Sequence, residues 1–91
     1  MEKHYALLFN RKTGKVIKAF EGTRAQCRLL GMSGRIGLTK TRDYVVFDEH
    51  GTCIMYLEGK TNDFPTICHD CEGLTYESFN IDMDEIIALF N

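Results

Sequence analysis

The second half of the chain has almost no basic residues. After Arg42 the sequence contains a single cation, Lys60, against eleven Asp and Glu residues, which gives residues 43–91 a net charge of −10. The first 42 residues have the opposite bias, since ten cations stand against two anions and give +8. Such a split predicts a basic surface for a polyanion and an acidic surface for another partner. The alternative is that two solvated faces attract each other within one domain.

The sequence also lacks tryptophan, has one proline and contains no long apolar run. The apolar residues 6–9 are too few for a signal-peptide core or a membrane span, so we expect neither a targeting segment nor a membrane partner. We therefore expect a cytoplasmic protein with reduced thiols, in which the four cysteines form no disulfides. A chain of 91 residues with 44% apolar content predicts one small globular domain over residues 1–91.

Recognisable catalytic motifs are missing as well. Neither a Ser/His/Asp or Cys/His set nor a phosphate-binding loop stands out. A redox role for Cys68 and Cys71 would need a helix to start at this pair, whereas Gly73 follows it. We therefore expect a protein that is not an enzyme.

Alternating apolar residues predict strands over residues 5–9, 16–20, 44–47 and 53–57, the first two joined as a hairpin over residues 4–20. Residues 58–67 look irregular, and a tight loop is expected at residues 68–73. The pair Asp82 and Glu85 predicts the start of a final helix. Its apolar stripe consists of Met83, Ile86, Ile87 and Phe90.

Residues 23–33 look like the first part of a helix-turn-helix. Thr23 with Gln26 forms a capping-box pattern, and Gly31 is suited to end the helix in a left-handed conformation. Ser33 could then cap a second, basic helix over residues 33–42. The alternative is a loop or a frayed helix, because the segment contains two glycines. The predicted fold class is α+β, with antiparallel hairpins flanking a helix-turn-helix-like segment and a C-terminal amphipathic helix.

The motifs around this helix follow one another in a familiar order. Tyr5, Gly14 and a strand ending in Phe20 precede it, and the turn Leu30-Gly31-Met32-Ser33 and the strand at residues 44–47 follow it. In this order residues 5–47 resemble the NUMOD-type modular DNA-binding domains at the tails of phage and intron homing endonucleases. Because no endonuclease motif accompanies it, the resemblance implies a free-standing DNA-binding module, such as a small phage-encoded regulator.

Residues 5–47 are therefore the candidate DNA-binding half, with duplex DNA as the expected partner. Seven side chains are expected to neutralise phosphates, and Arg35 and Lys40 are the best placed to approach base edges. The seven are Lys12, Lys15, Arg24, Arg28, Arg35, Lys40 and Arg42. The alternative function is a phage-type inhibitor or adaptor whose acidic half binds a basic surface of a host protein. A homodimer would be a third way to offset the acidic charge.

The acidic half, residues 48–91, holds a zinc-knuckle pattern. His50-x-x-Cys53 and Cys68-x-x-Cys71 are separated by fourteen residues, a spacing similar to that of zinc ribbons. The pattern predicts one structural zinc ion on His50, Cys53, Cys68 and Cys71, with His69 as a substitute for His50. The alternative is that Cys53 is a buried strand residue and His50 a turn residue.

Overall fold

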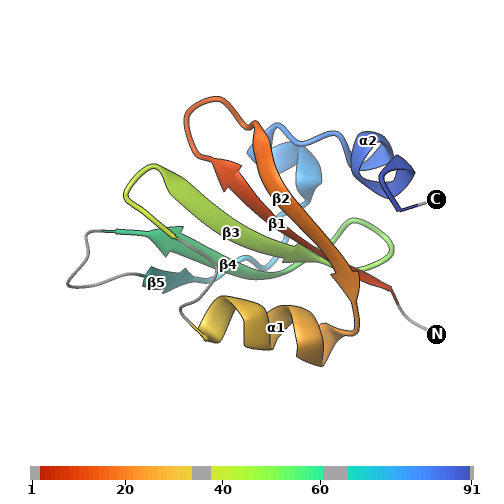
Figure 1. Cartoon of the computed structure of the whole chain (residues 1–91), viewed down its shortest axis with the longest axis horizontal. Coiled ribbons are helices and arrows are strands. Elements are labelled where there is room, and N and C mark those ends of the chain that lie inside the picture. Colours follow the sequence, from red (N-terminus) through yellow and green to blue (C-terminus); the bar gives the residue numbers. More distant parts are fainter. Residues whose placement is uncertain (1–2, 34–37, 61–65, 91) are drawn as a thin grey trace.

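A computed structural model describes residues 3–33, 38–60 and 66–90. Five antiparallel strands form one sheet in the order β2-β1-β3-β4-β5 (Figure 1). The strands are β1 (His4–Asn10), β2 (Val16–Gly22), β3 (Arg42–Phe47), β4 (Cys53–Gly59) and β5 (Thr66–His69). The helices are α1 (Arg24–Met32), the 3₁₀ helix η1 (Tyr76–Phe79) and α2 (Met83–Ala88).

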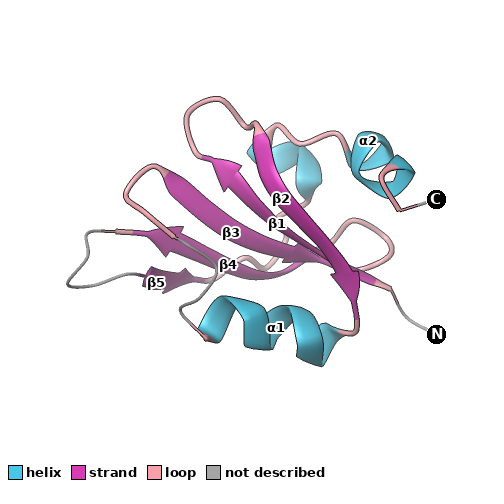
Figure 2. Ribbon diagram, viewed as in Figure 1, coloured by secondary structure: helices cyan, strands magenta, loops and turns pink. Residues whose placement is uncertain are grey.

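The helices cover the two faces of the sheet separately. α1 lies on one face, whereas η1 and α2 lie on the other (Figure 2). The central strands β1 and β3 are consequently buried on both faces, which explains the continuous apolar sequence of residues 5–9 and 44–47. Within the described residues no helix combines the length and apolar character that a membrane crossing requires.

The alternation of strand residues creates two apolar clusters. The cluster under α1 contains Ala6, Leu8, Cys27, Tyr44, Val46, Met55 and Leu57. The cluster under η1 and α2 contains Tyr5, Leu7, Phe9, Val45, Phe47, Cys53, Cys71, Ile81, Met83 and Ile86. Each large side chain that is fully buried contributes about 1.5–3 kcal/mol to folding, so both clusters stabilise the sheet together with the helices that cover it.

The predicted end of α1 is wrong. Thr23 and Gln26 form the expected capping box, but the helix continues through Gly31 to Met32. Gly31 is a packing residue, because a Cβ atom there would lie 2.6 Å from the Tyr44 ring. Leu29 is 68% exposed, whereas Cys27 is buried against the sheet.

The predicted helix-turn-helix is wrong as well. The chain after Leu38 runs through a turn directly into β3, which starts at Arg42, so a second helix over residues 33–42 is not formed. Residues 34–37 of that prediction lie outside the described residues. The fold is α+β, but it is a five-stranded sheet with two short helices, not hairpins that flank a helix-turn-helix.

Two elements of the second half were not predicted. β5 (Thr66–His69) pairs with β4 across residues 56–59, where an irregular segment and a tight loop were expected. η1 (Tyr76–Phe79) contributes Phe79, whose ring meets Phe9, Phe47 and Tyr56 edge-on. α2 begins at Met83 with Asp82 as its N-cap, where the sequence predicts a helix start.

Candidate nucleic-acid interface

One end of the sheet collects basic side chains from two separate turns. The β1–β2 turn, residues 11–15, lies beside residues 40–42 because Asn10 pairs with Arg42 and the Arg11 amide donates to the Thr41 carbonyl at 3.0 Å. We call five cations at this end the basic end: Lys12, Lys15, Lys18, Lys40 and Arg42. Four are exposed and Arg42 is half-buried.

Asn10 fixes the shape of the β1–β2 turn. Its side-chain oxygen accepts from the backbone amides of Lys12 and Thr13 at 2.9 and 3.1 Å, and its backbone N–H donates to the Lys15 carbonyl. Gly14 takes the positive φ of 75° that closes the turn. Because these contacts use only Asn10, Thr13 and backbone groups, the lysine side chains of the turn project into solvent.

A buried carboxylate ties this turn to the middle of the sheet. Asp43 is fully buried, and both of its oxygens accept from Arg11, the shortest contact being 2.7 Å from Nη2. The Tyr56 hydroxyl and the Gly59 amide also donate to it, at 3.1 and 3.2 Å. We call this set of contacts the Asp43 clamp. The hydrogen bond to Asp43 raises the pKa of Arg11, so Arg11 stays charged and its charge stabilises the fold through Asp43.

Glu58 extends the clamp toward β5. It lies 3.6 Å from Arg11, 2.6 Å from the Lys60 ammonium and 2.7 Å from Nε2 of His69. The hydrogen bonds with Lys60 and then His69 lower the pKa of Glu58 to about 2. Tyr56 stacks on the His69 ring, and burial followed by the neighbouring Asp43 carboxylate raises the pKa of Tyr56 to about 12. Asp43 and Glu58, the carboxylates next to the basic end, therefore interact with Arg11, Lys60 and His69 and not with the five cations of the basic end.

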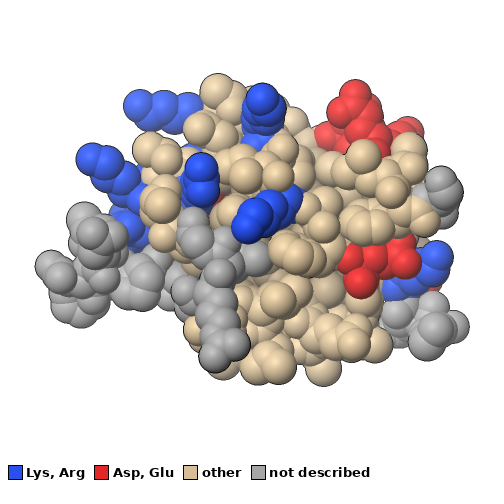
Figure 3. Space-filling view, in the orientation of Figure 1, with Lys and Arg blue, Asp and Glu red and all other residues tan. Residues whose placement is uncertain are grey.

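The five cations of the basic end make no ion pair with another described residue. Figure 3 shows Lys and Arg gathered toward the side of the molecule where the β1–β2 turn lies. Unpaired cations on adjacent turns and strands produce a positive potential that attracts a polyanion. The arrangement can therefore contact several phosphates of one backbone.

Of the seven side chains predicted to contact DNA, the structure brings Lys12, Lys15, Lys40 and Arg42 together. Arg24 and Arg28 line a different hollow, formed by α1, β4 and the loop after β5. Arg35 lies outside the described residues. Lys18 also belongs to the basic end, although it is not among the seven predicted side chains. Its position on the second strand of the hairpin is the feature that could have identified it.

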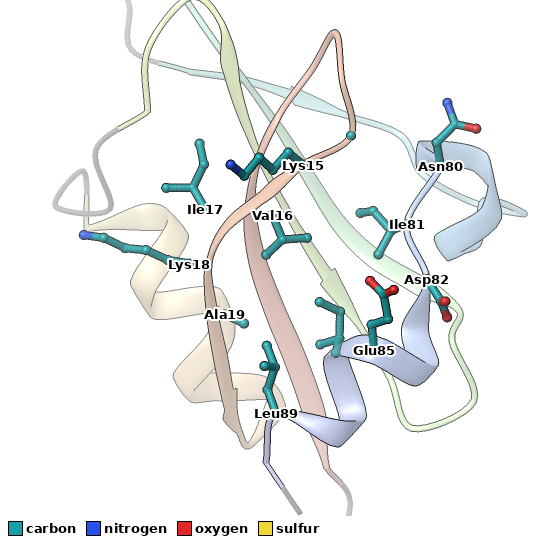
Figure 4. Close-up of a pocket in the computed structure, with 12 residues that line it drawn as sticks. Lys15, Val16, Ile17, Lys18, Ala19, Asn80, Ile81, Asp82, Glu85 and Leu89 are labelled. Atoms are coloured by element: carbon teal, nitrogen blue, oxygen red, sulfur yellow. The ribbon is translucent and has the colours of Figure 1, made fainter.

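The acidic side chains gather elsewhere. We call Glu77 of η1 and Asp82, Asp84 and Glu85 at the start of α2 the acidic layer; all four are exposed and none makes an ion pair with a described residue. Asp and Glu visible in Figure 3 lie on the side of the molecule that carries α2. A groove of about 420 Å³ separates Lys15 and Lys18 from Asp82 and Glu85 (Figure 4).

Three of the four predicted zinc ligands line one hollow. Cys53, Cys68 and Cys71 lie around it, and the buried Cys53 thiol donates to the Met55 carbonyl at 3.5 Å. Burial raises the pKa of Cys53, which disfavours the thiolate that a metal needs. His50 lines a different hollow, and His69 is engaged with Glu58. In the part of the chain that the structure describes, no three such side chains form a group able to hold a metal ion, so zinc stays a prediction.

No protein-family model matches the chain, and neither a curated protein nor a solved structure matches it. The NUMOD resemblance therefore depends on the short motifs alone, and one of these, the turn after residue 30, is helical here.

Proposed function

We propose that the protein binds duplex DNA through the basic end and has no catalytic role. One observation carries the proposal: five cations from adjacent segments lie at one end of the sheet without an ion-pair partner among the described residues. Each cation that meets a phosphate releases condensed counterions, which makes such binding favourable and strongly dependent on salt.

The Asp43 clamp supports this proposal. Backbone phosphates have a regular spacing, so a matching set of cations gains most when the turns that carry them are held in place. Arg11 provides this hold by joining the β1–β2 turn to β3 and β4 through Asp43 and the Gly59 carbonyl, which it contacts at 2.8 Å. Lys40, on the neighbouring turn, is our candidate for contact with base edges.

The test is fluorescence anisotropy of a labelled duplex of about 20 base pairs, titrated with the whole protein at two salt concentrations. We expect binding that weakens steeply as salt rises, and Lys40→Ala should weaken it further. A role in base reading would cost about 1–3 kcal/mol and relax sequence preference, whereas a phosphate role would mainly lower the salt slope. No binding at low salt would contradict the proposal.

The acidic layer supports the second candidate function, an inhibitor or adaptor that binds a basic surface of a host protein. Its four carboxylates are exposed, close in sequence and unpaired within the described residues. Binding through this layer would be weakened by Asp84→Asn and Glu85→Gln, and not by Lys40→Ala. The same two sets of variants therefore separate the two functions.

A further inference from the structure

A hollow lies between the sheet and η1, beside the basic end. Phe9, Asp43 and Tyr56, from three neighbouring strands, form its floor. Leu74 and Phe79, from the segment that covers this face of the sheet, form the opposite wall. The volume of the hollow is about 290 Å³, just below the range of roughly 300–1,000 Å³ that is typical of sites for drug-sized ligands. The hollow therefore suits a single small ring system.

Three aromatic rings line the hollow. The Phe79 ring meets Phe9 and Tyr56 edge-on, with ring centroids 5.7 and 4.9 Å apart. Phe79 and Tyr56 are only half-buried, so part of each ring remains accessible. Aromatic side chains bind nucleic-acid bases by stacking, and they do so for every base because each base has a flat π-face. A flat heterocycle is therefore a suitable occupant.

Hydrogen-bonding groups with free capacity surround these rings. Arg11 donates to Asp43 through Nε and Nη2, whereas its Nη1 lies 3.6 Å from Glu58 and makes no hydrogen bond with a described residue. The Tyr56 hydroxyl donates to Asp43 and can still accept. The Asn80 amide, which has no hydrogen-bond partner in the described part of the chain, adds a donor and an acceptor. A purely apolar occupant would leave these groups without water, whereas the polar edge of a base can satisfy them.

The hollow opens next to the turn that carries two lysines of the basic end. Arg11 starts this turn and lines the hollow. Gly14 of the same turn packs against the end of η1, since a Cβ atom there would lie 3.2 Å from the Asn80 carbonyl oxygen. Lys12 is exposed and Lys15 belongs to the same turn. A DNA backbone that is bound by these two lysines therefore passes the rim of the hollow.

We propose that this hollow takes up one unpaired base of DNA that is bound at the basic end. The inference rests on the proposed DNA binding and adds the kind of site that is preferred, a duplex with an unpaired nucleotide. The base stacks against Phe79 and Tyr56 and presents its edge to Arg11 and Asn80. Extruding a paired base from a duplex costs free energy, whereas a bulged base is already unpaired, so the bulged duplex is favoured.

The experiment is fluorescence anisotropy of the whole chain with three labelled duplexes of the same sequence. The first is fully paired, the second carries one bulged nucleotide, and the third carries an abasic nucleotide at the bulge. The abasic duplex keeps the sugar and the phosphate of the bulge and lacks only the base. We expect the bulged duplex to bind roughly ten-fold more tightly than the abasic duplex, because the base stacks in the hollow.

Two variants of the hollow should reduce this ratio. Asn80→Gly removes the amide, and glycine readily adopts the positive φ of 58° at this position. Leu74→Trp fills the hollow and should bring the ratio close to one. Ile67→Trp adds the same ring on β5, outside the hollow, and should keep the ratio of the parent chain.

The outcomes separate the base site from the proposed function. Equal affinity of the parent chain for the bulged and the abasic duplex, with the paired duplex still bound, would overturn the base site and leave DNA binding at the basic end intact. No binding to any of the three duplexes at low salt would contradict both. A ratio that is unchanged in Asn80→Gly and in Leu74→Trp would place the base elsewhere on the protein and would overturn the hollow as its site.

Discussion

The basic end and the acidic layer both carry charge that no described ion pair neutralises, but they are attached to the fold in different ways. The β1–β2 turn of the basic end is joined to β3 and β4 by the buried Asp43 clamp. The acidic layer stands on η1 and α2, helices of four and six residues that are held by end caps and by buried Met83 and Ile86. Cations that are held in fixed positions can match the regular spacing of backbone phosphates. Carboxylates that are held less firmly act mainly through the negative electrostatic potential that they produce.

This difference gives the two regions complementary roles in the proposed DNA binding. The basic end attracts the phosphate backbone at close range. The acidic layer repels it, so the protein is favoured to approach DNA with one side only. Variants of the basic end and variants of the acidic layer should therefore change different measured quantities, namely stability in one case and duplex binding in the other.

Removing the carboxylate of the Asp43 clamp should have the largest effect, a loss of unfolding free energy. Asp43→Ala leaves the Gly59 amide and the Tyr56 hydroxyl without their acceptor and frees Arg11, so we expect a loss of about 3 kcal/mol of unfolding free energy. Urea denaturation measures this loss. Asp84→Ala in the acidic layer should cost less than about 1 kcal/mol. Equal losses would show that the two regions are equally important to the fold.

Acid should weaken the neighbourhood of the basic end through Glu58. Its folded pKa of about 2 lies below the ordinary value of 4.5, so its contribution to stability is present above pH 4.5 and is lost as pH falls toward 2. Denaturation at several pH values should show a smaller acid loss in Glu58→Gln than in the parent chain. An unchanged acid profile would mean that the contacts with Lys60 and His69 do not persist in solution.

Neutralising the acidic layer should have the smallest effect, a gain in the affinity for duplex DNA. Asp84→Asn with Glu85→Gln removes two carboxylates that repel DNA, so we expect non-specific duplex binding to strengthen by a few-fold at low salt. The gain should disappear in high salt, where charges are screened within a few Å. Asp82 is left in place because it caps α2. Weaker DNA binding in this variant would assign the acidic layer a direct role.

The sequence predicts the strands of the sheet better than its helices. Alternating or continuous apolar residues identify β1 to β4 because these strands bury one or both faces. The sequence predicts a helix end at Gly31, because glycine tolerates the left-handed conformation found there. In the structure the helix continues, since the Tyr44 and Leu57 side chains from distant strands leave no room for a Cβ atom at this position. β5 was missed because its four residues take their structure from pairing with β4 and carry little periodicity of their own.

The candidate interface could be predicted only in part. The count of charged residues identifies the cations of the first half. The predicted hairpin then explains why Lys12 and Lys15 lie near the start of β3. Arg24 and Arg28 are separated from the other cations because of the side of α1 that meets the sheet. Buried Cys27 and exposed Leu29 show which side this is, and the local sequence does not indicate it. The union of Arg11 with Asp43, 32 residues apart, is a tertiary contact that no local pattern indicates.

The central claim is tested most directly by comparing two double variants with equal changes in charge. Lys12→Gln with Lys15→Gln removes two cations from the basic end, and Arg24→Gln with Arg28→Gln removes two from α1. If the basic end binds phosphate, the first pair lowers the salt slope of duplex binding by about 2, whereas the second leaves it almost unchanged. Equal reductions would mean that net charge alone attracts DNA and would contradict an interface at the basic end.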